Sequence, residues 1–277
     1  MIGIYHKSDL DGVCCKHIMR RHWVPEDITE LIGAEYGDAA PLTKLMDQSV
    51  WIADFSYDKK TMQNIHDVSL DLNWCDHHVS AIKEIGGGLN PGDKFFNYSD
   101  QSRSGCEILW DALTDEPMPL AVRLLGRYDV WDHVDPRVLP FQYGMRVVDE
   151  DNNQVWDSVL EAGDESDLIA QTIATGHAII RYEQSQWKRL AEKAYVREWD
   201  GFKCLIVNVG GFTSKMLESH PEYANVDILI GWSYTNGEFT YSLRSMRAVD
   251  VSVIAKNFGG GGHKGAAGFK TSEFMFT

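Results

Sequence analysis

The sequence predicts a two-domain α/β protein, with an N-terminal parallel-sheet domain and a smaller C-terminal α/β domain joined by a helical linker. Three observations support this class. Short apolar segments alternate with helical patterns in the first half of the chain, a long amphipathic segment follows, and further short strands precede a glycine-rich run. The length of 277 residues is also sufficient for two hydrophobic cores.

In the first half, the apolar or alternating segments end directly before aspartate or histidine. They lie at 2–5 (IGIY), 50–53 (VWIA) and 69–75 (SLDLNWC), and helical patterns lie between them at 12–23 and 41–48. Strands that alternate with helices favour a parallel sheet. Ligands bind beyond the carboxyl ends of such strands, which is where these polar residues fall.

The rest of the first domain and the linker are expected to be helical. Helical patterns lie at 101–113 and 118–128, and an amphipathic pattern from 166 to 197 is interpreted as the interdomain linker. The domains predicted from this division are 1–165, which would carry the chemistry, and 198–277, which would bind substrate.

The second domain combines predicted strands at 203–209, 227–232 and 239–244 with a helix at 250–258 that Asp250 would cap. Four glycines follow this helix. Their backbone N–H groups could approach a phosphate closely, because glycine lacks a side chain, although a flexible hinge is the alternative for such a run.

The composition is that of an ordinary globular protein, with 44% hydrophobic and 24% charged residues. No run of about 18 apolar residues occurs, and the charged N-terminal segment does not resemble a signal peptide, so we expect a cytoplasmic protein without membrane contact. The five cysteines are odd in number and lack C-x-x-C spacing, which indicates reduced, buried thiols.

A formal net charge of −15 argues against a broad basic surface for long duplex nucleic acid. It does not exclude a small phosphate ester as substrate, because bound divalent cations would reverse the local sign at a carboxylate-rich site. The oligomeric state cannot be read from the sequence.

Four separate segments place metal-ligating side chains where strands or helices should end. They are His6, Asp9 and Asp11; Asp54; Asp76, His77 and His78; and Asp129. A lone aspartate at such a place is usually a turn former or a helix cap, but carboxylates that converge repel one another unless a cation compensates them. Spacing alone leaves Asp132 and His133 as alternatives to Asp129.

The ligand chemistry points to a pair of divalent ions. Carboxylate and imidazole ligands without thiolate suit Mn²⁺, with Mg²⁺ as the alternative, and two such ions can clamp both oxygens of an in-line phosphoryl displacement. No serine or cysteine nucleophile is then required.

Four motifs together resemble the DHH phosphoesterase superfamily with its DHH-associated C-terminal domain. They are H-K-S-D-L-D-G at 6–12, the strand end at Asp54, the literal D-H-H at 76–78, and G-G-G-G-H-K-G-A-A-G-F at 259–269. The combination spans nearly the whole chain, and the wording of the first motif is most similar to the NrnB-type oligoribonucleases.

The resemblance implies a role for each residue of the first domain. His6 and Asp9 would hold one ion, Asp11, His77 and Asp129 the other, and Asp54 would bridge the two. His78 would contact the scissile phosphate, and Asp76 would orient its neighbours. In the second domain, the resemblance implies that the substrate end is held by Arg244, Gly260, Gly261, Gly262 and His263.

The expected function is therefore that of a Mn²⁺-dependent phosphodiesterase, in particular a 3′-5′ exonuclease that releases nucleoside 5′-monophosphates from short oligonucleotides. A substrate of a few nucleotides needs few phosphate contacts, which is compatible with the acidic charge. The first alternative is hydrolysis of a small nucleotide such as a cyclic dinucleotide or a 3′,5′-bisphosphate nucleotide. A non-catalytic nucleotide-binding protein is the alternative from another class.

Overall fold

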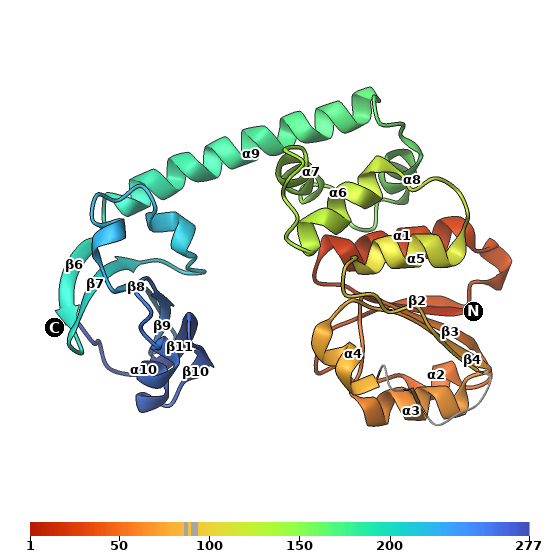
Figure 1. The fold of residues 1–277 in the computed structure, drawn as a ribbon, viewed down its shortest axis with the longest axis horizontal. Helices are drawn as coiled ribbons and strands as arrows, with labels where there is room; N and C mark the ends of the chain where they lie inside the picture. The colour runs from red at the N-terminus through yellow and green to blue at the C-terminus, as the bar shows by residue number, and fades with distance from the viewer. Residues whose placement is uncertain (86–87, 90–93, 277) are drawn as a thin grey trace. The chain divides into compact units, whose positions relative to one another are not determined.

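The computed structural model describes residues 1–85, 88–89 and 94–276. The chain divides into two compact units, Met1–Ile179 and Ile180–Thr277 (Figure 1). The division falls within the longest helix, α9 (Asp167–Ala191), which covers most of the segment expected as a linker. The assignment of catalysis to the first domain and of substrate binding to the second stays a prediction.

The first unit contains a five-stranded sheet in which every pairing is parallel, with strand order β2-β1-β3-β4-β5. Its strands are β1 (Ile2–His6), β2 (Glu30–Ala34), β3 (Ser49–Ala53), β4 (Asp71–Cys75) and β5 (Phe95–Asn97). The three strands predicted in this half are β1, β3 and β4, and they are neighbours at the centre of the sheet. Their carboxyl ends therefore meet at one edge.

Helices cover both faces of this sheet (Figure 1). They are α1 (Leu10–His22), α2 (Leu42–Leu45), α3 (Lys59–Val68), α4 (Val79–Ile85), α5 (Gly105–Leu113), α6 (Leu120–Asp129), α7 (Val138–Met145) and α8 (Asn153–Glu161), with a short 3₁₀ helix at Pro25–Asp27. Apolar side chains of α2, α3 and α4 fill the core on one face, and those of α1, α5, α6, α7 and α8 fill the core on the other. Burial on both faces is typical of a parallel sheet.

The second unit contains a six-stranded mixed sheet of order β10-β11-β9-β8-β7-β6, in which only β7 and β8 pair in parallel. Its elements are β6 (Tyr195–Trp199), β7 (Phe202–Asn208), β8 (Ile228–Thr235), β9 (Glu238–Ser245), α10 (Val251–Asn257), β10 (Gly261–His263) and β11 (Ala266–Thr271), with short 3₁₀ helices at Ser214–Leu217 and Tyr223–Asn225. Side chains alternate along β7, so that Cys204 and Ile206 join the core that contains α10, whereas Leu205 and Val207 join a second core on the other face.

The predicted fold class is confirmed, as is the Asp250 cap of α10, whose carboxylate accepts a hydrogen bond from the Ser252 N–H at 3.1 Å. All five cysteines are buried and unpaired, as expected. Part of the glycine run is a strand and not a flexible hinge, whereas its proposed contact with a phosphate stays a prediction. Gly259 has φ 77° and ends α10, while Gly261 and Gly262 lie in β10, paired with β11.

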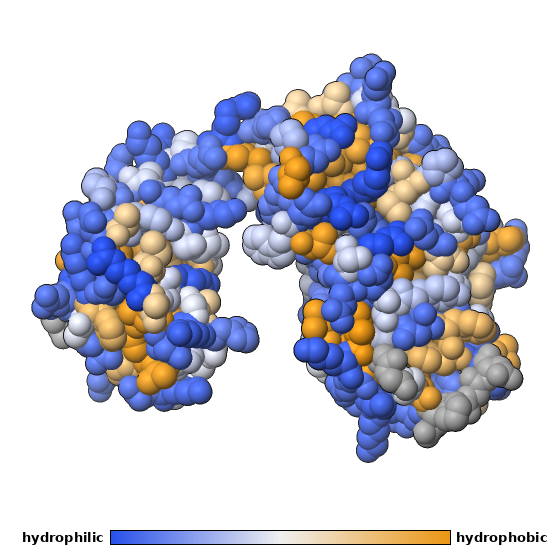
Figure 2. Space-filling view, in the orientation of Figure 1, coloured by the Kyte–Doolittle hydropathy of each residue, from blue (hydrophilic) through white to orange (hydrophobic). Residues whose placement is uncertain are grey.

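Polar and charged residues cover most of the face shown in Figure 2, with apolar residues scattered among them. Among the described residues, no helix has the length and apolar character needed to cross a membrane.

Candidate metal centre

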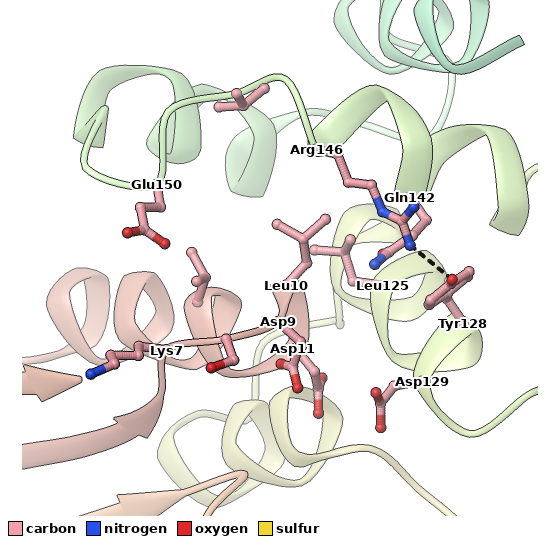
Figure 3. A pocket seen from close by; sticks show the side chains of 13 residues that line it. Lys7, Asp9, Leu10, Asp11, Leu125, Tyr128, Asp129, Gln142, Arg146 and Glu150 are labelled. Carbon is pink, nitrogen blue, oxygen red and sulfur yellow. Dashed lines mark hydrogen bonds between the residues drawn. The ribbon is translucent and has the colours of Figure 1, made fainter. Parts of the chain in front are cut away.

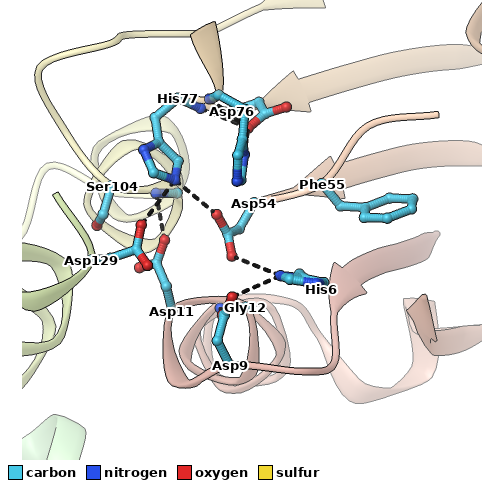
Figure 4. Close-up of polar contacts among 12 residues, drawn as sticks. His6, Asp9, Asp11, Gly12, Asp54, Phe55, Asp76, His77, Ser104 and Asp129 are labelled. Atoms are coloured by element: carbon cyan, nitrogen blue, oxygen red, sulfur yellow. Dashed lines mark hydrogen bonds and ion pairs between the residues drawn. The ribbon is translucent and has the colours of Figure 1, made fainter. Parts of the chain in front are cut away.

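The predicted ligands of the first unit meet at the carboxyl edge of its sheet (Figure 4). β1 ends at His6, Asp54 follows β3, and Asp76 and His77 follow β4. Asp54 has a left-handed backbone with φ 54°, and its N–H donates to the carbonyl of Cys75 at 2.8 Å. This turn sends the Asp54 side chain into the space between the strand ends, where it is 1% exposed.

The first turn of α1 supplies two more carboxylates. Asp9 caps the helix and accepts a hydrogen bond from the Gly12 N–H at 2.9 Å, and Asp11 lies in the first turn. A Cβ at Gly12 would lie 1.9 Å from the carbonyl oxygen of His6, so only glycine lets α1 begin this close to the end of β1. The glycine of the H-K-S-D-L-D-G motif therefore brings both carboxylates to the strand end.

Asp11 is held from its other side by the N-terminus of α5. Its carboxylate accepts hydrogen bonds from the backbone N–H groups of Gly105, at 2.7 Å, and Cys106, at 3.1 Å. A helix N-terminus favours a negative charge, and these two donors fix the carboxylate in place. A Cβ at Gly105 would lie 2.4 Å from Cβ of Asp54, so this contact also requires glycine.

Short distances connect the ligands into two sets that share Asp54. In the first set, Nδ1 of His6 lies 2.7 Å from Asp9 and 3.8 Å from Asp54. In the second, Nε2 of His77 lies 3.2 Å from Asp54 and 3.0 Å from Asp129, which ends α6.

The same residues form groups whose ligand atoms all lie within 4.8 Å of one another. These groups are His6, Asp9 and Asp54; Asp11, Asp54, His77 and Asp129; and Asp54, Asp76, His77 and His78. Asp54 is the one member that all three groups share. The first two groups match the two ligand sets implied by the resemblance, while their role as ligands stays a prediction.

Several buried polar atoms of this centre have no hydrogen-bond partner among the described residues. They are Nδ1 of His6, both carboxylate oxygens of Asp54, Oδ2 of Asp76 and Nε2 of His77. Buried polar atoms normally find partners, and here the unpaired atoms approach one another without hydrogen-bond geometry. Divalent cations would satisfy the unpaired atoms of His6, Asp54 and His77, so the donor set fits a metal centre of oxygen and imidazole ligands.

The electrostatics agree with this interpretation. Burial raises the pKa of Asp54 well above its ordinary value, and the nearby charge of Asp11 raises it further. Burial and the charge of Asp129 also raise the pKa of Asp11, to about 6. Without a cation, the folded protein therefore disfavours the ionised form of both carboxyl groups.

The two remaining residues of the D-H-H motif form a separate contact. Oδ1 of Asp76, which is fully buried, accepts hydrogen bonds from the N–H groups of His77, at 2.7 Å, and His78, at 3.1 Å, and lies 2.7 Å from Nδ1 of His78. Asp76 therefore fixes the turn after β4 and the ring of His78. The His78 side chain is 35% exposed, so it is accessible to a substrate.

The alternatives to Asp129 lie outside these groups. Asp132 forms an ion pair with Arg127 at 3.6 Å, and the His133 ring stacks on Tyr128 with ring centroids 5.3 Å apart. The geometry therefore favours Asp129 over both.

The residues predicted to hold the substrate end lie in the second unit. Arg244, on β9, donates to the carbonyls of Leu243, at 2.9 Å, and Phe212, at 3.4 Å. The N–H of Gly260 donates to the carbonyl of Ala255 at 2.9 Å, so this amide is already hydrogen-bonded to the last turn of α10. The roles of Arg244, Gly260, Gly261, Gly262 and His263 stay predictions.

Sequence reasoning did not identify the amides of Gly105 and Cys106 that hold Asp11. One signal was available, because S-x-x-E at 104–107 is a capping-box pattern, and the structure forms this box between Ser104 and Glu107. Tyr36, whose ring lies 5.6 Å from that of His6 and 6.1 Å from that of His78, was also not identified. No short-range pattern marks it.

Comparison with known proteins gives a fold and a distant relative. No protein-family model matches the chain. An uncharacterized protein, R106, of Acanthamoeba polyphaga mimivirus is 29% identical over 241 residues, which are 83% of this chain and 55% of that protein. The chain thus spans about half the length of this curated relative.

Among solved structures, the pGpG-specific phosphodiesterase PggH from Vibrio cholerae superposes with a TM-score of 0.54 at 11% identity, over 98% of this chain and 93% of that one. RecJ from Thermus thermophilus in complex with Mn²⁺ superposes more loosely, with a TM-score of 0.45 at 13% identity, over 97% of this chain and 49% of that one. The likeness to PggH shows a shared two-domain α/β fold, which is the fold class predicted from the sequence.

Proposed function

We propose that this chain is a metal-dependent phosphodiesterase, in particular a 3′-5′ exonuclease that releases nucleoside 5′-monophosphates from short oligonucleotides. The observation that carries the proposal is the position of Asp54. It is shared by the group with His6 and Asp9 and by the group with Asp11, His77 and Asp129. A carboxylate shared by two ligand sets is what a centre for two adjacent cations requires.

In this proposal the first group holds one divalent ion, the second group holds the other, and Asp54 contacts both. Mn²⁺ is the proposed ion and Mg²⁺ the alternative, because the ligands are carboxylates and imidazoles. When bound, such ions supply Lewis acidity toward a phosphoryl oxygen and lower the pKa of water.

The chain's own residues orient this centre. The amides of Gly105 and Cys106 hold the Asp11 carboxylate, so that it need not reorganise when a substrate binds. The carboxylate of Asp76 orients the His78 ring through Nδ1, and in the imidazolium form of His78 the opposite nitrogen, Nε2, would donate a hydrogen bond to a phosphate oxygen. His78 would thereby stabilise charge on the scissile phosphate, and Asp76 would position it.

Short substrates are favoured by charge and by similarity. The net charge of −15 disfavours a long polyanion, whereas cations at the centre would attract a few phosphates. The structural neighbour PggH acts on pGpG, a linear dinucleotide. In the second unit, Arg244, the glycines at 260–262 and His263 are the residues proposed to bind substrate.

Hydrolysis of a defined substrate set tests the proposal. The set contains pGpG, 5′-labelled RNAs of two, five and twenty nucleotides, cyclic di-AMP and a 3′,5′-bisphosphate nucleotide, each with Mn²⁺, with Mg²⁺ or with EDTA. We expect metal-dependent cleavage of the shortest RNAs to nucleoside 5′-monophosphates, and loss of this activity in Asp54→Asn. Asp115→Asn removes an exposed carboxylate and serves as the matched control.

Other outcomes of this experiment would support a different function. Inert RNAs beside a hydrolysed cyclic dinucleotide or bisphosphate would indicate a small-nucleotide phosphodiesterase or phosphatase. Metal-dependent binding of these compounds without turnover would indicate a non-catalytic nucleotide-binding protein.

A further inference from the structure

A cavity of about 510 Å³ lies within the first unit, beside the metal centre (Figure 3). Three carboxylates of the centre, Asp9, Asp11 and Asp129, form part of its wall, and apolar side chains of Leu10 and Leu125 form another part. Its volume is in the range of about 300–1,000 Å³ that is typical of small-molecule sites. A molecule in this cavity would contact the proposed metal ligands directly.

One polar side chain in the wall has an oxygen atom without a hydrogen-bond partner among the described residues. Gln142, on α7, is 5% exposed, and its side-chain oxygen is buried without a hydrogen-bond partner among the described residues. Figure 3 shows its amide beside Leu10 and Leu125, at the cavity. A buried amide oxygen without a partner destabilises the folded protein, because it has lost the hydrogen bond that water supplies in the unfolded chain. A ligand whose donor group reaches this oxygen would replace that hydrogen bond.

A cation is held in place on the same side of the cavity. Arg146 follows α7, and its Nη2 donates to the hydroxyl of Tyr128 at 2.9 Å. Its guanidinium also lies 4.5 Å from the ring centroid of Tyr143. A guanidinium ordered in this way retains further N–H donors for a phosphate oxygen.

We propose that this cavity binds a nucleoside unit of the substrate, with its base read by Gln142 and an adjacent phosphate held by Arg146. The proposal rests on the proposed function, because the carboxylates that face the cavity are those assigned to the ions. Apolar walls suit the faces of a base, and the Gln142 amide can present either its oxygen or its NH₂ group to the edge of the base. The cavity would then select nucleotides over other phosphodiesters.

The substitution Gln142→Leu keeps the approximate volume of the side chain and removes its hydrogen-bonding groups. Gln154→Leu, at an exposed position of α8, is the matched control. We would measure kcat/KM for dinucleotides that differ in one base and for methyl p-nitrophenyl phosphate, which has no base. In Gln142→Leu, kcat/KM for dinucleotides should fall by about fivefold or more relative to kcat/KM for the methyl ester, mainly because KM for the dinucleotides rises. Differences between bases should narrow as well.

Thermal unfolding separates this role from a structural one. Removal of an unpartnered buried amide should leave the melting temperature of Gln142→Leu unchanged or higher, whereas a structural hydrogen bond would lower it. Should Gln142→Leu not fold, Arg146→Gln changes an exposed side chain and should raise KM for dinucleotides relative to the methyl ester.

Binding of uncharged nucleosides in EDTA gives a readout that does not require turnover. Calorimetry with guanosine, adenosine, cytidine and uridine should show weaker binding to Gln142→Leu than to the wild type or to Gln154→Leu. Nucleoside binding without hydrolysis of any phosphodiester would uphold the cavity assignment and reject the proposed function. Hydrolysis with equal substrate ratios and equal nucleoside affinities in all three proteins would overturn the cavity assignment alone.

Discussion

Replacement of Asp54 by asparagine should stabilise the metal-free protein and abolish its response to metal. Asp54 is 1% exposed and both of its carboxylate oxygens lack hydrogen-bond partners among the described residues. Its pKa is raised by burial and then by the charges of Asp11 and Asp9. The folded state therefore works against ionisation of this carboxyl group in the absence of a cation.

The magnitude follows from the geometry. Ligand atoms of Asp54 and Asp11 lie within 4.8 Å of one another, and two unit charges at that distance repel by about 3 kcal/mol at an effective dielectric constant of about 20. Uptake of a proton sets an upper limit to this penalty, since at pH 8 protonation of a carboxyl with an unfolded pKa near 4 costs about 5 kcal/mol. The buried amide of asparagine loses about 1 kcal/mol of the gain. The net stabilisation is then about 2 kcal/mol, or about 4–8 °C in melting temperature.

Calorimetric melting in EDTA and in Mn²⁺ would test this at pH 8 and pH 5. Because the pKa of Asp54 is raised in the folded protein, the free energy of unfolding of the wild type falls as pH rises. The stabilisation by Asp54→Asn should therefore be smaller at pH 5 than at pH 8. Mn²⁺ at about 100 times its Kd should stabilise the wild type by about 2.7 kcal/mol and leave the variant unchanged, so that the wild type then melts higher than the variant. The reasoning is refuted if Asp54→Asn melts no higher than the wild type in EDTA at pH 8, or if the exposed Asp115→Asn gives the same increase.

Three further substitutions have outcomes that the structure determines. His17 is fully buried, its Nε2 lies 2.9 Å from the carbonyl oxygen of Glu150, and burial lowers its pKa to about 4. The free energy of unfolding should therefore fall as pH drops from about 6.5 toward 4, by about 3 kcal/mol more in the wild type than in His17→Phe, as measured by denaturant titrations. Gly105→Ala should weaken Mn²⁺ binding, measured by calorimetry, at least about tenfold. The new Cβ would lie 2.4 Å from Cβ and 2.8 Å from Cα of Asp54, so this ligand must move. An affinity equal to that of the wild type would contradict this prediction. Trp131 has φ 60° and is 81% exposed, so Trp131→Asn should raise the free energy of unfolding by about 1 kcal/mol, and an unchanged urea midpoint would show that the backbone there is unstrained.

The fold class and the strands whose ends carry the candidate ligands were predictable from the sequence, whereas several surrounding elements were not. The strands Ile2–His6, Ser49–Ala53 and Asp71–Cys75 are mostly buried and mostly apolar, and a residue with distinctive chemistry ends or follows each of them. The strand at Glu30–Ala34 was not predicted because it lies at the edge of the sheet, where burial is partial and the pattern weak. The helix at Val138–Met145 was not predicted because proline and glycine interrupt its sequence.

The strand formed by part of the glycine run was not predictable from local composition. Glycine has a low strand propensity, yet Gly261 and Gly262 form a strand because β11 pairs with them. A Cβ on Gly262 would lie 2.5 Å from Cα of Ala267, and one on Gly260 would lie 2.1 Å from the carbonyl oxygen of Gly268. These glycines are thus required by close backbone packing within the second unit, a constraint that is long-range and leaves no local pattern. Any phosphate contact they make would be additional to that packing requirement, so a substitution such as Gly260→Ala would test the fold before it tested substrate binding.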